Sequence, residues 1–485
     1  MNASDASLDS ATRVFEGDRP KGAGDISTIE SHGIAPIPLE NRYGSTWRNL
    51  TVWFAPNINV SGLFTGSLAV YFGLGFWQAV VAVVVGTVLG CLPVAYLARW
   101  GPQTGMGQLP LARLPFGKTI AVPALVQWIS TIAWDALVGL FGAEALETLF
   151  HVPFAVGAII ILVIEGVMGF MGYELIHQFE KWASLLAVVF FTILAVRVIQ
   201  HGGVQWHNTV HGGTAWGMFF LMVAISVSLG IGWATYAADY SRYMKPDASS
   251  GAIFGYTLAG LSFSYIWVLV LGAAAGTFLT DQTAVGVQHL MGGGLGTFGL
   301  IAMGIGAVAS NQMNDYSGSL ALQAAGVKVK RPYIAALVII IAFGLIMWMH
   351  SGTTAAKFEN LLLFTGYWVA PFAAVVMIDW TYREHGLSLR ALKESLEFRN
   401  LESGWSALVA LLVGFGAMVP FMNTELIEGP VAKALDGTDL SFYVGFVVTL
   451  GVYYVLRAVD LGRQKATAPP EDTPLAELTP PLAGT

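Results

Sequence analysis

Long apolar runs alternate with short polar segments along most of the chain, from about residue 48 to residue 460. A helix that crosses the hydrocarbon core of a bilayer needs about 20 predominantly apolar residues. Twelve runs approach or reach that length: 48–70, 74–100, 118–142, 153–173, 178–200, 214–237, 250–278, 294–323, 332–349, 356–380, 403–423 and 440–460. The pattern therefore predicts an all-α polytopic membrane protein with twelve transmembrane helices.

The two ends of the chain differ from this apolar middle. Residues 1–40 are polar and acidic, and residues 464–485 are rich in proline. No apolar stretch follows a basic start, so we expect no signal peptide. We expect a cytosolic N-terminal tail over 1–40, a transmembrane domain over 41–463 and a disordered cytosolic C-terminal tail over 464–485.

The composition supports a membrane protein. Hydrophobic residues make up 55% of the chain and charged residues 11%, whereas soluble proteins carry about 25% charged residues. Too few polar side chains remain to cover a water-facing surface, which excludes a soluble enzyme. The net charge of -7 offers no basic surface for nucleic acid. The lipid bilayer is the partner that this composition predicts.

The Lys and Arg residues indicate how the helices are oriented, because cytoplasmic loops carry an excess of them. With both termini inside, twelve helices place every Lys and Arg on the inside except Arg197, Lys357 and Lys433. A wrong number of helices would scatter these charges over both sides. We therefore expect N- and C-termini in the cytoplasm and the protein in the cytoplasmic membrane.

Two of the apolar runs are interrupted by residues that disfavour a continuous helix. The run 48–70 contains APNINVSG at Ala55–Gly62, and the run 214–237 contains SVSLGIGW at Ser226–Trp233. Backbone breaks at membrane depth are tolerated where they are buried in protein or line a cavity. We therefore expect both breaks to border a site inside the protein.

The two interrupted runs occupy matching positions in the chain. They open two successive groups of five helices, at about 48–200 and 214–380, which precede two last helices at 403–460. Broken helices at matching positions of two halves point to an inverted-repeat transporter whose site lies near the bilayer midplane. Close helix packing through Gly and Ser is the alternative, and it is stronger for the second break.

Four acidic residues lie inside apolar runs, where ionisable groups are costly and are functional-site candidates by default. They are Asp135, Glu165, Asp239 and Asp315. Asp135 could accept hydrogen bonds from ring N–H groups of a substrate or carry a proton; a structural acid is the alternative. Glu165 is either a second proton carrier or a buried protonated acid. Asp239 precedes Arg242, which favours an ion pair at the end of its helix.

One segment, SNQMNDYS at 310–317, concentrates polar side chains inside an apolar run. Asn311 and Asn314 are three residues apart and share a helix face. Amides donate and accept hydrogen bonds, which suits the edge of a heteroaromatic ring; an interhelical hydrogen-bond cluster is the alternative. Trp134 and Trp233 lie beside the buried acid and the second break, where they could stack on a flat ring.

The sequence carries no motif of the common enzyme classes. HExxH, P-loop and GxSxG patterns and Cys/His metal spacings do not occur in it. We therefore expect no enzyme activity, no cofactor and no metal site.

Several long segments resemble, in order, the nucleobase–cation symporter family of purine/cytosine permeases. They are IESHGIAPIP at 29–38, GPQTGMGQLPLARLPFGK at 101–118, WATYAADYSRYM at 233–244, NDYSGSLALQAAG at 314–326 and FTGYWVAPFAAVVMIDW at 364–380. The resemblance implies a leucine-transporter-like fold with ten helices in two inverted repeats of five, plus two C-terminal helices.

The resemblance also implies a binding site. In family members of known structure, two Trp residues sandwich the planar substrate, and these positions correspond to Trp134 and Trp233. An amide of the first helix and an Asn of the eighth bond the ring edges, and they fall on Asn59 and Asn314. The further substrate-binding residues that we expect are Asp135, Asn57, Gly232 and Asn311.

A cation site is implied as well, formed by backbone carbonyls near Ala55 and Ile58 together with the eighth helix near Ile305. Sodium-coupled members have two adjacent hydroxyl residues where this chain has Val308 and Ala309. Hard cations prefer oxygen ligands, so the departure favours proton coupling, with sodium as the alternative.

A second departure concerns the third helix. Many members carry an amide where this chain has Val138, and Asp135 is the candidate to replace its hydrogen bond. Asp135 is also the first candidate for the proton carrier, and Glu165 the second.

These observations predict a secondary-active symporter that imports cytosine, a purine or a related planar heterocycle. A permease of the same fold for another heterocycle, a vitamin or an amino acid is the main alternative. A channel or a ligand-binding sensor is a remote one. We expect no obligate protein partner.

Overall fold

The computed structural model describes residues 33–42, 44–171, 173–279, 283–327, 331–383 and 389–467. Within these residues the regular elements are helices, and no β-strand forms. The structure therefore confirms the predicted all-α fold. Most of the two predicted tails, at 1–32 and 468–485, lies outside the described residues.

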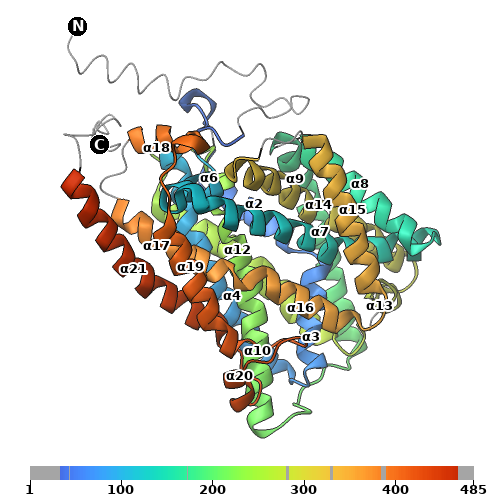
Figure 1. The fold of residues 1–485 in the computed structure, drawn as a ribbon. Coiled ribbons are helices and arrows are strands. Elements are labelled where there is room, and N and C mark those ends of the chain that lie inside the picture. Colours follow the sequence, from blue (N-terminus) through green and yellow to red (C-terminus); the bar gives the residue numbers. More distant parts are fainter. Residues whose placement is uncertain are drawn as a thin grey trace, which may run out of the picture.

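Each predicted run coincides with one or more helices (Figure 1). The runs that form one main helix give α4 (Phe76–Ala98), α7 (Ala121–Phe150), α8 (Phe154–Met171), α9 (Tyr173–His201), α12 (Ser250–Ala275), α14 (Gly293–Ala324), α15 (Arg331–His350), α19 (Trp405–Met418) and α21 (Ser441–Thr467). Among the described residues, 8 helical segments are long and apolar enough to cross a membrane. Shorter apolar helices cover Val60–Tyr71, Phe154–Met168, Ala336–His350 and Trp405–Phe421. The protein is thus a multi-pass membrane protein, and the number of twelve spans stays a prediction.

The break in the first run lies where the sequence predicts it. The run divides into α2 (Arg48–Phe54), the 3-10 turn η2 (Ala55–Asn57) and α3 (Val60–Tyr71). Pro56 has no backbone N–H to continue the helix. Asn59 is the N-cap of α3, and its side-chain oxygen accepts the backbone N–H of Gly62 at 3.0 Å. The sequence PNIN therefore both ends one helix and begins the next.

The second break lies later than predicted. α10 (Gly212–Ile231) runs through most of the Ser/Gly segment and ends at the 3-10 turn η4 (Gly232–Thr235), which is followed by α11 (Ala237–Ser241). Ser226 and Ser228 lie within α10, and their hydroxyls donate to the carbonyls of Met222 in the same helix and Leu362 in the run 356–380, at 2.9 and 3.0 Å. The prediction of a break over Ser226–Trp233 is thus wrong for all but its last two residues.

A third break interrupts the run 356–380, which the sequence analysis treated as one helix. α16 (Thr354–Tyr367) ends before Trp368, and α17 (Val369–Arg383) follows. Pro371 lacks the N–H that would donate to the carbonyl of Tyr367 in a continuous helix. The run 356–380 stays predominantly apolar across this position, so the hydropathy pattern does not show the break.

The helices pack closely around the first break and η4. α14 lies along α7, α10 along α4, and α12 against α3 and α4. Glycines permit these contacts: a Cβ on Gly90 of α4 would lie 2.5 Å from the carbonyl oxygen of Val227 in α10. One on Gly66 of α3 would lie 2.1 Å from the carbonyl oxygen of Leu269 in α12.

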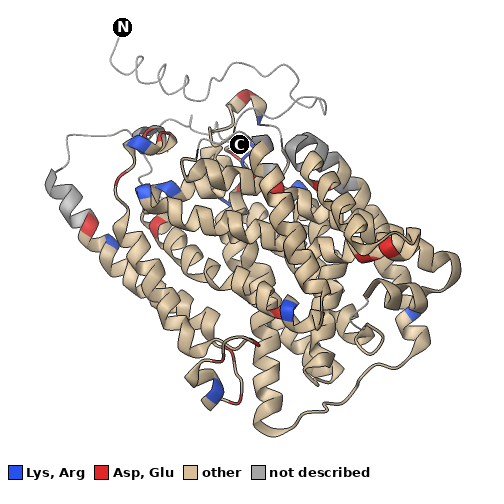
Figure 2. Cartoon of the chain, turned by 45° about the vertical axis from the view of Figure 1, so that its right-hand side comes forward, with Lys and Arg blue, Asp and Glu red and all other residues tan. Residues whose placement is uncertain are grey.

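Short helices connect the long ones at both ends of the bundle. They are η1 (Leu39–Asn41), α5 (Gly101–Thr104), α6 (Gln108–Phe116), η3 (Gly117–Ile120), α13 (Thr283–Met291), α18 (Leu389–Leu396), η5 (Phe398–Asn400), η6 (Val419–Phe421) and α20 (Pro430–Ala434). α6 and α18 lie at one end and α20 at the other (Figure 1). Most Lys and Arg residues gather at the end of α6 and α18 (Figure 2).

Part of the segment 33–40, which we assigned to the N-terminal tail, packs against the α6 end. The backbone N–H of Ile37 donates to the carbonyl of Gly105 at 2.9 Å, and Ile37 is fully buried. Arg42 donates to the carbonyls of Ile37 and Pro102, each at 2.7 Å. The packed part of the chain therefore begins before residue 40.

Candidate substrate pocket

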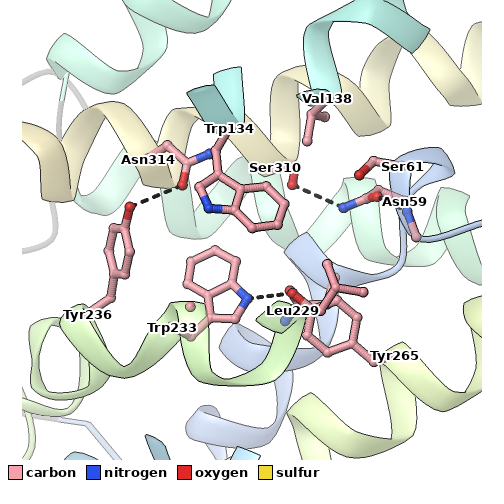
Figure 3. A pocket seen from close by; sticks show the side chains of 13 residues that line it. Asn59, Ser61, Trp134, Val138, Leu229, Trp233, Tyr236, Tyr265, Ser310 and Asn314 are labelled. Carbon is pink, nitrogen blue, oxygen red and sulfur yellow. Dashed lines mark hydrogen bonds between the residues drawn. The ribbon is translucent and has the colours of Figure 1, made fainter. Parts of the chain in front are cut away.

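A pocket lies between the first break, η4, α7, α12 and α14 (Figure 3). Its walls combine aromatic rings with amides and hydroxyls. The lining residues are Asn57, Asn59, Ser61, Gly62, Trp134, Val138, Leu229, Gly232, Trp233, Tyr236, Tyr265, Ser310 and Asn314. The structure thus brings together Asn57, Asn59, Trp134, Gly232, Trp233 and Asn314 of the predicted site.

Two indoles from different helical elements border the pocket. Trp134 comes from α7, and Trp233 from η4 (Figure 3). The Trp233 ring packs edge-on against Trp53 and Tyr236, with centroid distances of 5.6 and 5.2 Å. Its Nε1–H donates to the hydroxyl of Tyr265 at 2.7 Å. Trp233 is therefore held in one orientation on the pocket wall.

A chain of hydrogen bonds links one wall of the pocket to α14. Gln127 of α7 donates to the hydroxyl of Tyr236 at 2.8 Å, which donates to Oδ1 of Asn314 at 3.4 Å. Nδ2 of Asn314 donates to Oδ1 of Asn311 at 3.3 Å, and Nδ2 of Asn311 donates to the backbone carbonyl of Asp135 at 3.0 Å. The predicted shared face of the two asparagines is confirmed, although Asn311 is not among the lining residues.

The first break is tied to α14 by side chains. Nδ2 of Asn59 donates to the carbonyl of Pro56 at 2.6 Å and to Oγ of Ser310 at 3.1 Å. The Ser310 hydroxyl in turn donates to the same Pro56 carbonyl at 2.9 Å. Nδ2 of Asn57 donates to the carbonyl of Trp53 at 2.6 Å.

Three carboxyl groups gather behind the pocket, on α7, α8 and α14. They are Asp135, Glu165 and Asp315, which lie close enough to interact electrostatically. Asp135 and Glu165 are 2% and 1% exposed. The side-chain amides of Asn314 and Asn311 interact with Asp135 and Glu165, although among the described residues no group lies in good hydrogen-bond geometry to either oxygen of Asp135 or to Oε1 of Glu165. Asp135 does not line the pocket, so its direct contact with substrate stays a prediction.

Asp239 lies elsewhere, toward the α6 end. One carboxylate oxygen accepts the backbone N–H of Gln108 at the start of α6, at 2.7 Å, and the other accepts the Ser317 hydroxyl of α14, also at 2.7 Å. Asp239 thus joins three elements around the second broken helix. The sequence analysis considered only Arg242 as its partner.

Ala55 and Ile58, whose carbonyls we expect in a cation site, belong to the first break. The carbonyl of Ala55 accepts the backbone N–H of Ile58 at 3.4 Å, and η2 packs against α14. Val308 and Ala309 of α14 are buried and contribute no side-chain oxygen.

Sequence reasoning missed Tyr236, Tyr265, Ser61 and Leu229 as lining residues. Tyr236 stands next to Trp233 in the WATYAADY segment, which offered a signal. Tyr265 lies in the middle of α12, where a Tyr is compatible with a lipid-facing or a packed position. Only the placement of α12 beside α3 reveals its role.

Comparisons with known proteins show the family of this chain. The family described as permease for cytosine/purines, uracil, thiamine, allantoin matches residues 36–445. A putative purine-cytosine permease of Bacillus subtilis is 27% identical over 88% of this chain and 96% of its own. A purine-cytosine permease of Saccharomyces cerevisiae is 25% identical over 89% of this chain and 86% of its own.

Solved structures show the same fold. The nucleobase-cation-symport-1 family transporter Mhp1, closed with bromovinylhydantoin bound, superposes with a TM-score of 0.72 at 15% identity, over 93% of this chain and 99% of its own. Its inward-facing form gives a TM-score of 0.70 at 16% identity, over 92% and 99%. This confirms the predicted leucine-transporter-like architecture. The chain therefore belongs to the family of cytosine/purine permeases that its motifs predict, and it is a membrane transporter, not an enzyme.

Proposed function

We propose that this protein is a cation-coupled symporter that imports a nucleobase, cytosine or a purine, across the cytoplasmic membrane. The observation that carries the proposal is the pocket bordered by two indoles from different helices, Trp134 and Trp233. A flat ring between two indoles buries both of its faces, and aromatic pairs contribute about 0.5–1.5 kcal/mol beyond area burial. Asn314 lines the same pocket, where its side-chain amide can bond the edge of such a ring.

The experiment is a thermal-shift screen of the purified protein against cytosine, adenine, hypoxanthine and uracil, followed by uptake of the radiolabelled hit into proteoliposomes. A ligand that binds only the folded state raises the midpoint of unfolding by mass action. We expect a shift and saturable uptake with at least one of these bases. A protein that binds and transports none of them would refute the proposal.

The second candidate is transport of a related ring. The vitamin B6 transporter of Saccharomyces cerevisiae is 25% identical over 72% of this chain and 65% of its own. A pyridine ring would stack on the same indoles, so the screen includes pyridoxine and allantoin. A shift with pyridoxine alone would assign the pocket to this second function.

The coupling ion that we propose is the proton. The side chains of Val308 and Ala309 offer no oxygen to a hard cation, and the Ser310 hydroxyl is engaged by the carbonyl of Pro56. Buried carboxyl groups are the usual proton relays inside membrane transporters. Asp135 and Glu165 are the carriers that we favour, and the structure adds Asp315 as their neighbour.

The coupling proposal is tested in proteoliposomes with an imposed pH gradient and no sodium. Wild-type protein should accumulate substrate, whereas Asp135→Asn should equilibrate it without accumulation. Asp247→Asn, at an exposed loop position, serves as the matched control and should accumulate normally. Strict dependence on sodium would refute proton coupling, and normal accumulation by Asp135→Asn would remove Asp135 from it.

We also propose that both termini lie in the cytoplasm. The single Cys91 is buried, so an introduced surface cysteine can be labelled selectively. On intact cells, an impermeant maleimide should label Lys433→Cys and should not label Lys245→Cys; both side chains are exposed. The reverse pattern would invert the topology.

A further inference from the structure

The hydrogen-bonding capacity of the pocket walls is unevenly used. An Asn side chain has two N–H donors and one carbonyl oxygen. In Asn59 the oxygen caps α3 through Gly62, and Nδ2 donates to Pro56 and Ser310. Asn59 therefore has no N–H left for a bound ring. Its amide holds the first break closed.

Two hydroxyls on the pocket walls, those of Ser310 and Tyr236, are similarly occupied. The Ser310 hydroxyl gives its only proton to the carbonyl of Pro56. The Tyr236 hydroxyl accepts from Gln127 and gives its proton to Asn314. Neither hydroxyl can donate to a ligand without breaking a bond that holds the scaffold.

Tyr265 differs from these residues. An indole N–H can only donate, so in the 2.7 Å bond with Trp233 the Tyr265 hydroxyl must be the acceptor. The hydroxyl hydrogen of Tyr265 is therefore not used in this bond. Within the described residues, no second hydrogen bond of Tyr265 is present, and the residue lines the pocket (Figure 3).

The Tyr265 hydroxyl lies beside the edge of the Trp233 indole. The hydroxyl lies 2.7 Å from Nε1, which is at the edge of the indole. A ring stacked on the indole face would bring its own edge close to that point and so within reach of the hydroxyl. The hydroxyl therefore meets the edge of the ring, not its face.

From this arrangement we infer that Tyr265 is a specificity-determining residue, whose hydroxyl donates to a hydrogen-bond acceptor, a ring nitrogen or carbonyl oxygen, on the edge of the bound heterocycle. Asn59, which the family resemblance assigns to the ring edge, instead stabilises the first break. The inference rests on the proposed function, because it requires a flat ring on Trp233.

The test is calorimetric titration of the full-length protein with the base that binds wild type most tightly among cytosine, adenine and hypoxanthine. We expect Tyr265→Phe to raise Kd about 3- to 10-fold, the range for loss of one hydrogen bond. The matched control is Tyr256→Phe, on the same helix but 37% exposed, which should leave Kd within the error of the measurement. An unchanged Kd in Tyr265→Phe would overturn the inference.

The Trp233→Phe background distinguishes donation to the ligand from mere positioning of the indole. A Phe at 233 still stacks but has no N–H for Tyr265 to hold. If the hydroxyl donates to the ligand, adding Tyr265→Phe in this background still raises Kd at least 3-fold, by the logic of a double-mutant cycle. Loss of the effect in this background would overturn the inference and reduce Tyr265 to a positioning residue.

The double variant also protects the test against misfolding, because it removes the Trp233 N–H that Tyr265→Phe alone would leave without its partner. Its comparison with Trp233→Phe stays valid even if Tyr265→Phe alone is unstable. Failure of wild type to bind any base would refute the proposed function. Binding by wild type with no effect of Tyr265→Phe would refute only this inference.

Discussion

The two backbone breaks at the pocket are built differently. The first break is held by one of its own side chains and one from α14: Asn59 and Ser310 both donate to the carbonyl of Pro56. The second break presents Trp233 to the pocket, and the N–H of that indole donates to the Tyr265 hydroxyl. The first break is therefore a sealed joint between helices, and under the proposed function the second break is the platform on which the ligand stacks.

This difference has a consequence for alternating access. The sealed break lies against α14, on the same face as the amides of Asn311 and Asn314. A conformational change that separates the first helix from α14 must break the bond of Asn59 to Ser310 and the bond of Ser310 to Pro56, whereas the Asn59–Pro56 bond lies within the first break. The second break can instead respond to the ligand directly, because the ligand would stack on it.

Trp233→Ala should have the largest effect of the variants that separate the two breaks. Removing an aromatic anchor from a binding pocket costs about 2 kcal/mol or more, so Kd should rise about 30-fold or more. Trp216→Ala is the matched control, because Trp216 lies on α10 but is 59% exposed. This variant should bind normally. Titration calorimetry measures both. Equal affinity of the two variants would mean that the second break is not the platform.

Gly230→Ala tests why the second break lies later than its Gly and Ser residues suggest. A Cβ at Gly230 would lie 2.8 Å from the backbone of Gly90 and 2.9 Å from that of Cys91 in α4. Overpacking costs about 1–3 kcal/mol, so the melting temperature of the detergent-purified protein should fall.

The control for this variant is Gly255→Ala in α12, where a Cβ meets nothing within 4 Å. Ala is favoured over Gly inside a helix by about 0.5–1 kcal/mol, so this variant should melt at or above the wild-type temperature. If Gly230→Ala were as stable as Gly255→Ala, Gly230 would not be a packing glycine.

The sequence predicted the first break better than the second for a physical reason. Pro and Asn act locally, since they remove an N–H and cap a helix within four residues. Gly and Ser are ambiguous, because they serve helix packing as well as breaks. Gly230 packs on α4 while Gly232, two residues later, begins η4. Only the neighbouring helix distinguishes them.

The site shows the same limit. Trp233 and Asn314 were predicted because they lie on segments that resemble the family, and Trp134 because it precedes the buried Asp135 and matches the other Trp of the family's pair. Tyr265 could not be found, because its role depends on a contact between η4 and α12, 32 positions apart in sequence. The closure of Asn59 on Pro56 and Ser310 also depends on the packing of η2 against α14, which a sequence pattern does not contain.

Asn59→Ala should have the smallest effect of the three comparisons, and it tests the sealed break itself. Loss of an N-cap costs about 0.5–2 kcal/mol, and the Ala variant also frees the Pro56 carbonyl from one of its two donors. Asn59→Ser keeps a side-chain oxygen that can cap α3 but removes the two N–H donors. The melting temperature should therefore fall most for Asn59→Ala and less for Asn59→Ser. If the two variants melted at the same reduced temperature, the bonds of Nδ2 to Pro56 and Ser310, not the cap at Gly62, would hold the first break closed.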